Sequence, residues 1–200
     1  MKTAFLLAAT SASLLVASVA HAQFAWSNFY GTASVSYVDL QREAPTNPLI
    51  TRDNKNDAGV GLGIGYQFHP KLGIEVSQHD LGTTRLTDAT PGGPNYSDQS
   101  ARATVVAVKF TPWTDWTFQP FAKVGSARVK VAFDDTAGNA LRSARDQTYS
   151  ALGVDYRVTP KFKLGLMFEH YGRTADVAAP AGEPPRLSPR ALSLTSSISF

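Results

Sequence analysis

The sequence predicts an all-β fold, an eight-stranded antiparallel up-and-down transmembrane β-barrel. Three observations indicate this fold: apolar residues recur at every second position, the residues between them are small or polar, and short and long connections alternate. Period-two alternation is typical of a strand with one apolar face. The expected strands are 26–40, 57–68, 71–81, 100–110, 117–131, 146–158, 161–172 and 190–200.

The first 22 residues have the features of a secretory signal peptide. Lys2 provides a positive start, residues 4–20 form an uncharged, largely apolar stretch, and Ala20-His21-Ala22 matches an A-x-A cleavage site. The alternative is a membrane anchor, but Ser and Thr interrupt the apolar stretch and no stop-transfer charges follow it. We therefore expect residues 1–22 to be removed and residues 23–200 to form a single barrel domain.

The composition excludes several classes of protein. The net charge of +3 falls to +2 when Lys2 is removed, and this near-neutral balance argues against a nucleic-acid partner. There are no cysteines, so neither a disulfide framework nor a thiolate site is available. Residues 23–200 contain no run of about 18 apolar residues that could form a membrane helix. A closed barrel can still enter a membrane, because its strands satisfy the backbone groups of their neighbours.

The first expected strand, 26–40, is followed by the clearest one, 57–68. In the latter, Val60, Leu62 and Ile64 alternate with glycines at 59, 61, 63 and 65. A soluble core strand rarely turns four glycines toward its core, because glycine weakens strands and packs nothing. In a narrow barrel, glycines leave room for large side chains from neighbouring strands. We therefore expect the apolar face of this strand to contact lipid.

Most later segments repeat this arrangement. In 71–81, 100–110, 146–158 and 161–172, one face is apolar and the other carries small or charged residues. The faces of 117–131 cannot be assigned from the pattern without assuming a bulge. The last segment alternates apolar and small polar residues and ends on an aromatic; its apolar residues are Leu192, Leu194, Ile198 and Phe200.

The connections predict how the strands are ordered. Three connections are short: 69–70, 111–116 and 159–160. Four are long and polar: 41–56, 82–99, 132–145 and 173–189. Short turns at one end and long loops at the other are typical of outer-membrane barrels, whose termini lie on the periplasmic side. Aromatic residues that cluster near the short turns favour an interfacial girdle over ordinary strand aromatics: Tyr66, Phe68, Trp113, Trp116, Phe118, Phe162 and Phe200.

These patterns resemble the eight-stranded barrel domain of the OmpA type and its small relatives OmpX and Ail. The resemblance rests on Leu72-Gly-Ile-Glu-Val76, Phe121-Ala-Lys-Val-Gly125 and Gly153-Val-Asp-Tyr-Arg-Val-Thr-Pro-Lys161, and it covers essentially all of 23–200. It implies a cell outer-membrane protein surrounded by outer-membrane lipids and lipopolysaccharide. It also implies that the outer-membrane assembly machinery reads the closing strand, with Phe200 as the assembly signal.

The resemblance further implies a charge network inside the barrel, formed by Glu75, Lys109, Lys123 and Glu169. Charges in a lumen without bulk water must be paired and hydrogen-bonded, because an unpaired buried charge costs several kcal/mol. Such a network is either a gate for ions or a structural plug. An eight-stranded barrel is only wide enough for side chains to fill it, which favours the plug.

We expect no catalytic, cofactor or metal site. Ser77 and His79 share a strand face with Glu75 and would suggest an enzyme such as a lipid A deacylase. Successive residues on one face are about 6.6–7 Å apart, however, whereas a nucleophile and its base need about 2.6–3.2 Å. No two histidines have the spacing of metal ligands.

The sequence therefore predicts a non-enzymatic integral outer-membrane protein with a plugged polar interior, not an open porin. Its four surface loops are the expected site for any extracellular ligand. Two alternatives remain: an outer-membrane lipid-modifying enzyme, and a soluble, lipocalin-like periplasmic binder. The second alternative requires the apolar faces of the strands to point inward.

Overall fold

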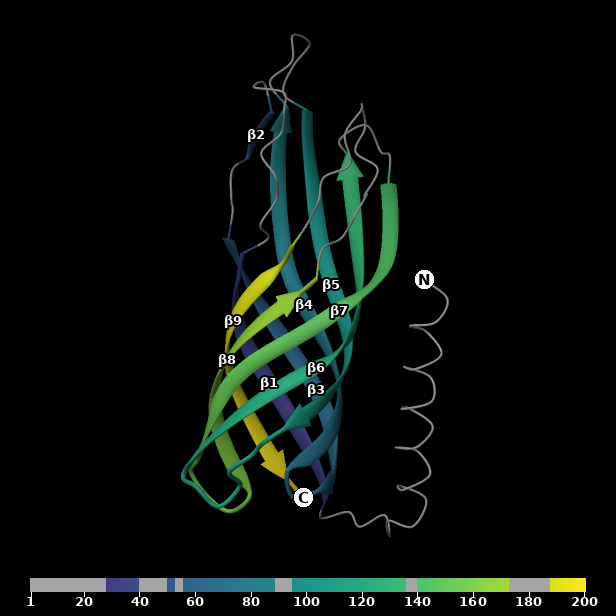
Figure 1. Cartoon of the computed structure of the whole chain (residues 1–200). Helices are drawn as coiled ribbons and strands as arrows, with labels where there is room; N and C mark the ends of the chain where they lie inside the picture. Colours follow the sequence, from purple (N-terminus) through teal and green to yellow (C-terminus); the bar gives the residue numbers. More distant parts are fainter. Residues whose placement is uncertain (1–27, 40–49, 53–55, 89–94, 136–139, 173–187) are drawn as a thin grey trace, which may run out of the picture.

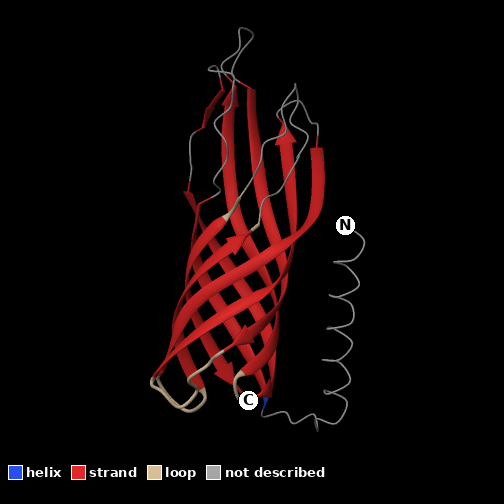
Figure 2. Cartoon of the chain, in the orientation of Figure 1, coloured by secondary structure: helices blue, strands red, loops and turns tan. Residues whose placement is uncertain are grey.

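A computed structural model describes residues 28–39, 50–52, 56–88, 95–135, 140–172 and 188–200. These residues form inclined antiparallel strands that twist around a common axis (Figure 1, Figure 2). No helix among them is long and apolar enough to cross a membrane. The strands are β1 (Phe29–Asp39), β2 (Ile50–Arg52), β3 (Asn56–His69), β4 (Leu72–Asp88), β5 (Asn95–Phe110), β6 (Phe118–Asp135), β7 (Ala140–Arg157), β8 (Phe162–Tyr171) and β9 (Arg190–Ser199).

Eight of these strands close into a barrel, which confirms the predicted fold class. Around the barrel the order is β4, β3, β1, β9, β8, β7, β6 and β5, and pairing between β4 and β5 closes the ring. The closing strand β9 pairs with β1 from Tyr30↔Ser199 to Asp39↔Arg190. Strand β2, which the sequence did not predict, pairs only with the far end of β4, from Ile50↔Asp88 to Arg52↔Leu86.

The three short connections and the carboxyl end of the chain lie at one end of the barrel (Figure 1). Residues 70–71, 111–117 and 158–161 join β3 to β4, β5 to β6 and β7 to β8. Backbone bonds fix these turns: Thr111 N donates to Lys71 O at 2.9 Å, and Val158 N donates to Phe162 O at 3.0 Å. We call this the short-turn end and the opposite end the loop end.

The predicted bounds of two long loops, 82–99 and 132–145, are wrong. Paired strand continues to Asp88↔Asn95 between β4 and β5, and to Asp134↔Ala140 between β6 and β7. Toward the loop end the outward side chains become polar, as at Arg102 and Arg128, so the alternation that marks the rest of the strands is lost. Of the other two predicted loops, 41–56 contains β2 and the start of β3, and residues 173–187 of the loop 173–189 lie outside the described residues, as does the predicted signal peptide.

Over the part of the barrel nearer the short turns, the outer face of the strands is apolar. Val60, Leu62 and Ile64 on β3 are 60%, 71% and 53% exposed, while the glycines between them face the interior. The same arrangement holds for Val106 and Val108 on β5. This placement is the one that a surrounding lipid phase requires. It is the reverse of what a lipocalin-like binder with an inward apolar face needs.

The glycines of β3 do leave room for large side chains. A Cβ at Gly65 would overlap the ring of Tyr30, and one at Gly61 would lie 2.7 Å from Nδ1 of His79. Both neighbours are buried in the interior. The missing side chains of β3 therefore determine how far Tyr30 and His79 can extend across the lumen.

The faces of β6, which the pattern could not assign, are regular. Phe121, Lys123 and Val129 are buried inside, whereas Val124 and Arg128 are exposed. The pairing of β6 with β5 and with β7 has no register shift, so no bulge is present. The sequence was ambiguous because Lys123 stands on the inner face where most strands carry small residues.

The aromatic girdle is only partly as expected. Trp113 and Trp116 stack at 5.1 Å between ring centroids and are about half exposed at the short-turn end, as is Phe200. Tyr66, in contrast, is only 8% exposed and packs against Phe29 at 4.8 Å. The register of β3 shifts between Gln67 and His69, where strict alternation along this strand ends.

Candidate functional site

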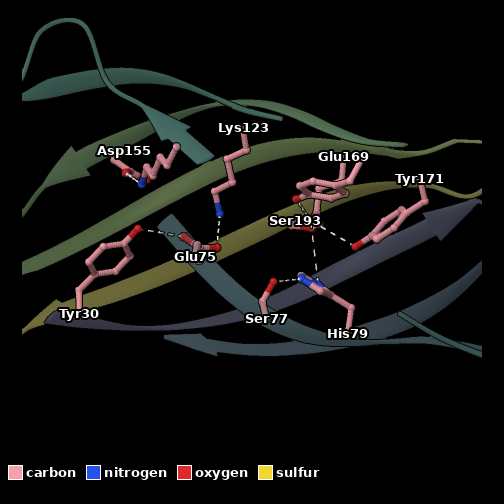
Figure 3. Close-up of polar contacts among 11 residues, drawn as sticks. Tyr30, Glu75, Ser77, His79, Lys123, Asp155, Glu169, Tyr171 and Ser193 are labelled. Carbon is pink, nitrogen blue, oxygen red and sulfur yellow. Dashed lines mark hydrogen bonds and ion pairs between the residues drawn. The ribbon is translucent and has the colours of Figure 1, made fainter. Parts of the chain in front are cut away.

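The first polar cluster of the interior is centred on Glu75 of β4. The Nζ of Lys123, on β6, donates to Oε1 of Glu75 at 2.5 Å, and Tyr30 OH, on β1, donates to Oε2 at 3.3 Å (Figure 3). The side chains of Lys123 and Glu75 are only 7% and 5% exposed. Because these two side chains are shielded from water, each charge depends on the other for its stabilisation, and water cannot easily replace a lost partner.

A second ion pair lies nearby. Lys109 of β5 donates to Oδ2 of Asp155, on β7, at 2.7 Å. The Lys109 ammonium also lies 4.2 Å from the centroid of the Phe121 ring, and the Lys123 ammonium lies 5.6 Å from the same ring. Because Lys109 and Lys123 face each other directly across the β5–β6 ladder, each cation needs its own carboxylate and the aromatic ring near them.

Farther toward the loop end, Glu169 of β8 is fully buried and accepts three hydroxyl hydrogen bonds. Tyr149 OH and Tyr171 OH donate to its Oε1 at 2.6 and 3.2 Å, and Ser193 Oγ donates to Oε2 at 2.5 Å (Figure 3). Ser193 in turn lies 2.8 Å from the Oγ of Ser36. This carboxylate is satisfied by hydroxyl donors rather than by a cation.

Ser77 and His79 on β4 connect the two regions. Their Oγ and Nε2 atoms are 2.8 Å apart, so the sequence argument that same-face spacing separates them too far is wrong. The Cα spacing along a strand does not limit side chains that lean toward each other. The Nδ1 of His79 lies 4.0 Å from Oε1 of Glu169, which is too long for a hydrogen bond.

An apolar layer fills the interior between these clusters and the loop end. Its side chains come from several strands and are at most 2% exposed: Val38, Leu81, Ala101, Ala103, Val129 and Val131. A small cavity remains beside the polar clusters, and Thr32, Ser34, Gly61 and Thr195 contribute to its lining. The side chains of the polar clusters and of the apolar layer are thus buried within the described part of the barrel.

The four charged residues that the sequence singled out all lie in the interior, but they do not form one network. Glu75 pairs with Lys123, Lys109 pairs with Asp155, and Glu169 is bound by hydroxyl groups. The partners that sequence reasoning missed are Asp155, Tyr149, Tyr171, Ser193 and Tyr30. Period-two alternation places each of them on an inner face, whereas the choice of partner depends on the register between strands.

Phe200, the predicted assembly signal, is 58% exposed just beyond the end of β9. Its backbone N donates to Phe29 O at 3.1 Å, which ties the last residue to the first residue of β1. The ring therefore lies on the outside of the barrel at the short-turn end. Among the described residues, no group of three or more His, Asp or Glu side chains could hold a metal ion.

Comparison with known proteins agrees with this architecture. Residues 6–200 match the family described as the outer membrane protein beta-barrel domain, and the chain belongs to this family. No curated protein sequence gives a significant match. The protein is therefore an eight-stranded β-barrel protein of the cell outer membrane.

Three solved structures illustrate the similarity. Neisserial surface protein A is 16% identical, with 87% of this chain and 98% of that chain covered and a TM-score of 0.57. OprG from Pseudomonas aeruginosa is 13% identical, covering 86% and 95%, with a TM-score of 0.59. The outer membrane protein AlkL, studied in lipid bilayers, is 16% identical, covering 89% and 93%, with a TM-score of 0.56. At these identities the similarity shows the fold alone.

Proposed function

We propose that this protein is a closed, non-enzymatic barrel that serves the outer membrane as a structural or surface-interaction protein and does not conduct ions. The observation that supports the proposal is the set of buried side chains in the described part of the barrel interior. Two shielded ion pairs, Lys123–Glu75 and Lys109–Asp155, lie toward the short-turn end, and the apolar layer lies toward the loop end. An ion crossing the barrel would have to separate buried charges and then pass the apolar layer, both of which are costly.

The proposal includes an orientation. Short turns and termini face the periplasm in barrels of this kind, so the loop end faces outward. The extended hairpins β4–β5 and β6–β7 then project from the cell. Strand β4 ends at Asp88, beyond the predicted bound of 81, and β6 ends at Asp135, beyond the predicted bound of 131. Any extracellular ligand would meet these hairpins and the other two predicted loops, 41–56 and 173–189.

Conductance in a planar lipid bilayer tests the closed-barrel proposal. We expect no steady single-channel current from the folded protein, because the ion pairs and the apolar layer block the lumen. A variant in which Val129 and Val131 are both changed to glycine serves as a comparison, since it empties part of the apolar layer but leaves both ion pairs intact. A steady current through the unaltered barrel would contradict the proposal.

We further propose that Phe200 is an assembly signal. Removing Phe200 deletes one exposed ring and one backbone bond to Phe29, so the free energy of unfolding should change little. The rate of insertion by purified assembly machinery should fall several-fold. Phe200→Leu is the matched control, because it retains the backbone bond and changes only the ring. Unchanged insertion of the truncated chain would contradict this role.

An outer-membrane lipid-modifying enzyme is the second candidate, and the 2.8 Å contact of Ser77 with His79 favours it. Two features oppose it. Both residues are buried in the lumen rather than on the lipid-facing wall, and Glu169 is 4.0 Å from the imidazole with its oxygens already bound by hydroxyl groups. Mass spectrometry of lipid A from cells with the protein or its Ser77→Ala variant distinguishes the two functions, because only an enzyme would leave acyl-chain differences.

A further inference from the structure

Three basic side chains gather inside the barrel at its short-turn end (Figure 1). They are Lys109 of β5, Arg157 at the end of β7 and Lys163 near the start of β8, which we call the mouth cations. Arg157 and Lys163 are half-buried and lie directly opposite each other in the β7–β8 ladder. Both point inward, because their neighbours Tyr156 and Leu164 are exposed on the outer face.

The mouth cations are not balanced by carboxylates inside the described part of the barrel. Asp155 is paired with Lys109 at 2.7 Å, and none of the ion pairs among the described residues includes Arg157 or Lys163. Asp115 lies exposed in the turn between β5 and β6 and takes part in none of these pairs either. The charges that act on Lys163 are those of Lys109, Arg157 and Asp155. Three positive charges and one negative charge therefore leave an excess of two positive charges.

The donors around this excess charge suit an oxyanion. The Nη2 of Arg157 donates to Thr114 O, which holds the guanidinium in place and uses one of its five N–H donors. Ser197 of β9 faces Lys163 across the β8–β9 ladder and adds a hydroxyl group. Ser197 and Asp155 also border the small cavity of the lumen, so the site is polar on more than one side. A planar guanidinium matches two oxygens of a phosphate, and an ammonium group adds a compact positive charge.

We propose that Arg157 and Lys163 bind a small oxyanion of the phosphate class in the mouth of the barrel. The site does not depend on the closed lumen, and the proposed orientation only determines that the anion comes from the periplasm. Like charges in facing cross-strand positions destabilise a sheet, and partial burial reduces their screening by salt. A bound dianion balances the excess charge and relieves this repulsion. It also stabilises the folded barrel, because the unfolded chain lacks the site.

The double variant Arg157→Gln/Lys163→Gln tests the site. Each protein is folded in dodecyl maltoside, a detergent without phosphate, and titrated with inorganic phosphate at a fixed sodium chloride concentration. The line width of the phosphate signal in phosphorus NMR measures binding. We expect the unaltered barrel to broaden this signal in a saturable way. The double variant should bind phosphate about tenfold more weakly or worse, which corresponds to a loss of about 1.4 kcal/mol.

The matched control is Lys71→Gln/Lys161→Gln, which removes two exposed positive charges from short turns at the same end of the barrel. This control should bind phosphate as the unaltered protein does. Equal loss of binding in both double variants would overturn the proposal, as would a phosphate signal that the unaltered barrel leaves sharp. Phosphatidylglycerol added to the micelles should not displace the phosphate. Displacement at equal concentration would assign the site to a lipid headgroup instead of a free anion.

Urea unfolding gives a second readout. Phosphate stabilises proteins in general because it is excluded from their surfaces, an effect that all the variants share. Only stabilisation that the control retains and the double variant lacks reports the site. Equal stabilisation of all three proteins by phosphate would count against it.

Folding and conductance are checked separately from binding. A heat-dependent shift in SDS gel mobility reports whether each variant has folded, and only folded proteins are compared. If the double variant does not fold, Lys163→Gln alone replaces it, because Arg157 then keeps its bond to the turn carbonyl. A conducting barrel that still binds phosphate through these residues would refute the closed-lumen proposal and leave the anion site standing. A non-conducting barrel that does not bind phosphate would refute the anion site alone.

Discussion

Replacing Lys123 by methionine should destabilise the folded barrel by about 3–5 kcal/mol. Methionine keeps most of the side-chain volume but leaves the Tyr30 hydroxyl, at 3.3 Å, as the remaining hydrogen-bond partner of the buried Glu75. Because the two ionised side chains are just 7% and 5% exposed, water cannot take the place of the ammonium group. Equilibrium unfolding by urea in lipid vesicles measures the change.

A double-mutant cycle separates the ion pair from general effects of the substitution. Adding Glu75→Gln to Lys123→Met removes the uncompensated carboxylate and should recover much of the lost stability. Lys161→Met is the matched control, since Lys161 lies exposed in a short turn and its loss should change the free energy of unfolding by less than about 0.5 kcal/mol. If Lys123→Met cost no more than this control, the pair would have no structural role.

Much of the barrel could be predicted from the sequence because the bilayer imposes a simple rule on it. We call the band of outward apolar side chains the apolar belt. Inside this belt the outward side chains of each strand must be apolar, as Val60, Leu62 and Ile64 are. Apolar and other residues therefore alternate along the strand over about ten residues. Beyond the belt the rule no longer applies: Arg102 and Arg128 meet water or headgroups. The sequence pattern therefore predicts loops where the ends of β4 to β7 lie.

The sequence predicts which side chains point into the barrel, but it does not predict which of these side chains contact each other. Alternation places Glu75, Lys109 and Glu169 inside the barrel, and the family resemblance implies the same for Lys123; the structure has all four side chains in the interior. Which carboxylate meets which cation depends on how far each strand is shifted along its neighbours, and composition carries little information about that shift. Glu169 shows the consequence, since its partners are hydroxyl groups from β7, β8 and β9 instead of a lysine.

Arginine at position 106 should destabilise the membrane-folded barrel by about 2–4 kcal/mol. Val106 is 46% exposed on the outer face of β5, between Val76 on β4 and Ser126 on β6, and it lies midway between Phe110 at the short-turn end and Arg102 at the polar edge. A guanidinium at this depth must reach toward either interface or draw water into the hydrocarbon. Urea unfolding in vesicles of defined thickness measures the cost.

Thr148→Arg is the control for depth, because Thr148 is exposed on the outer face of β7 next to Asp146, at the polar edge of the belt. The same charge should cost about 0–1 kcal/mol there. The difference between the two positions should also shrink in thinner bilayers, since Val106 then lies closer to an interface. Equal costs at both positions in every bilayer would mean that Val106 does not face hydrocarbon. The outward apolar belt would then need another partner, such as a second protein surface.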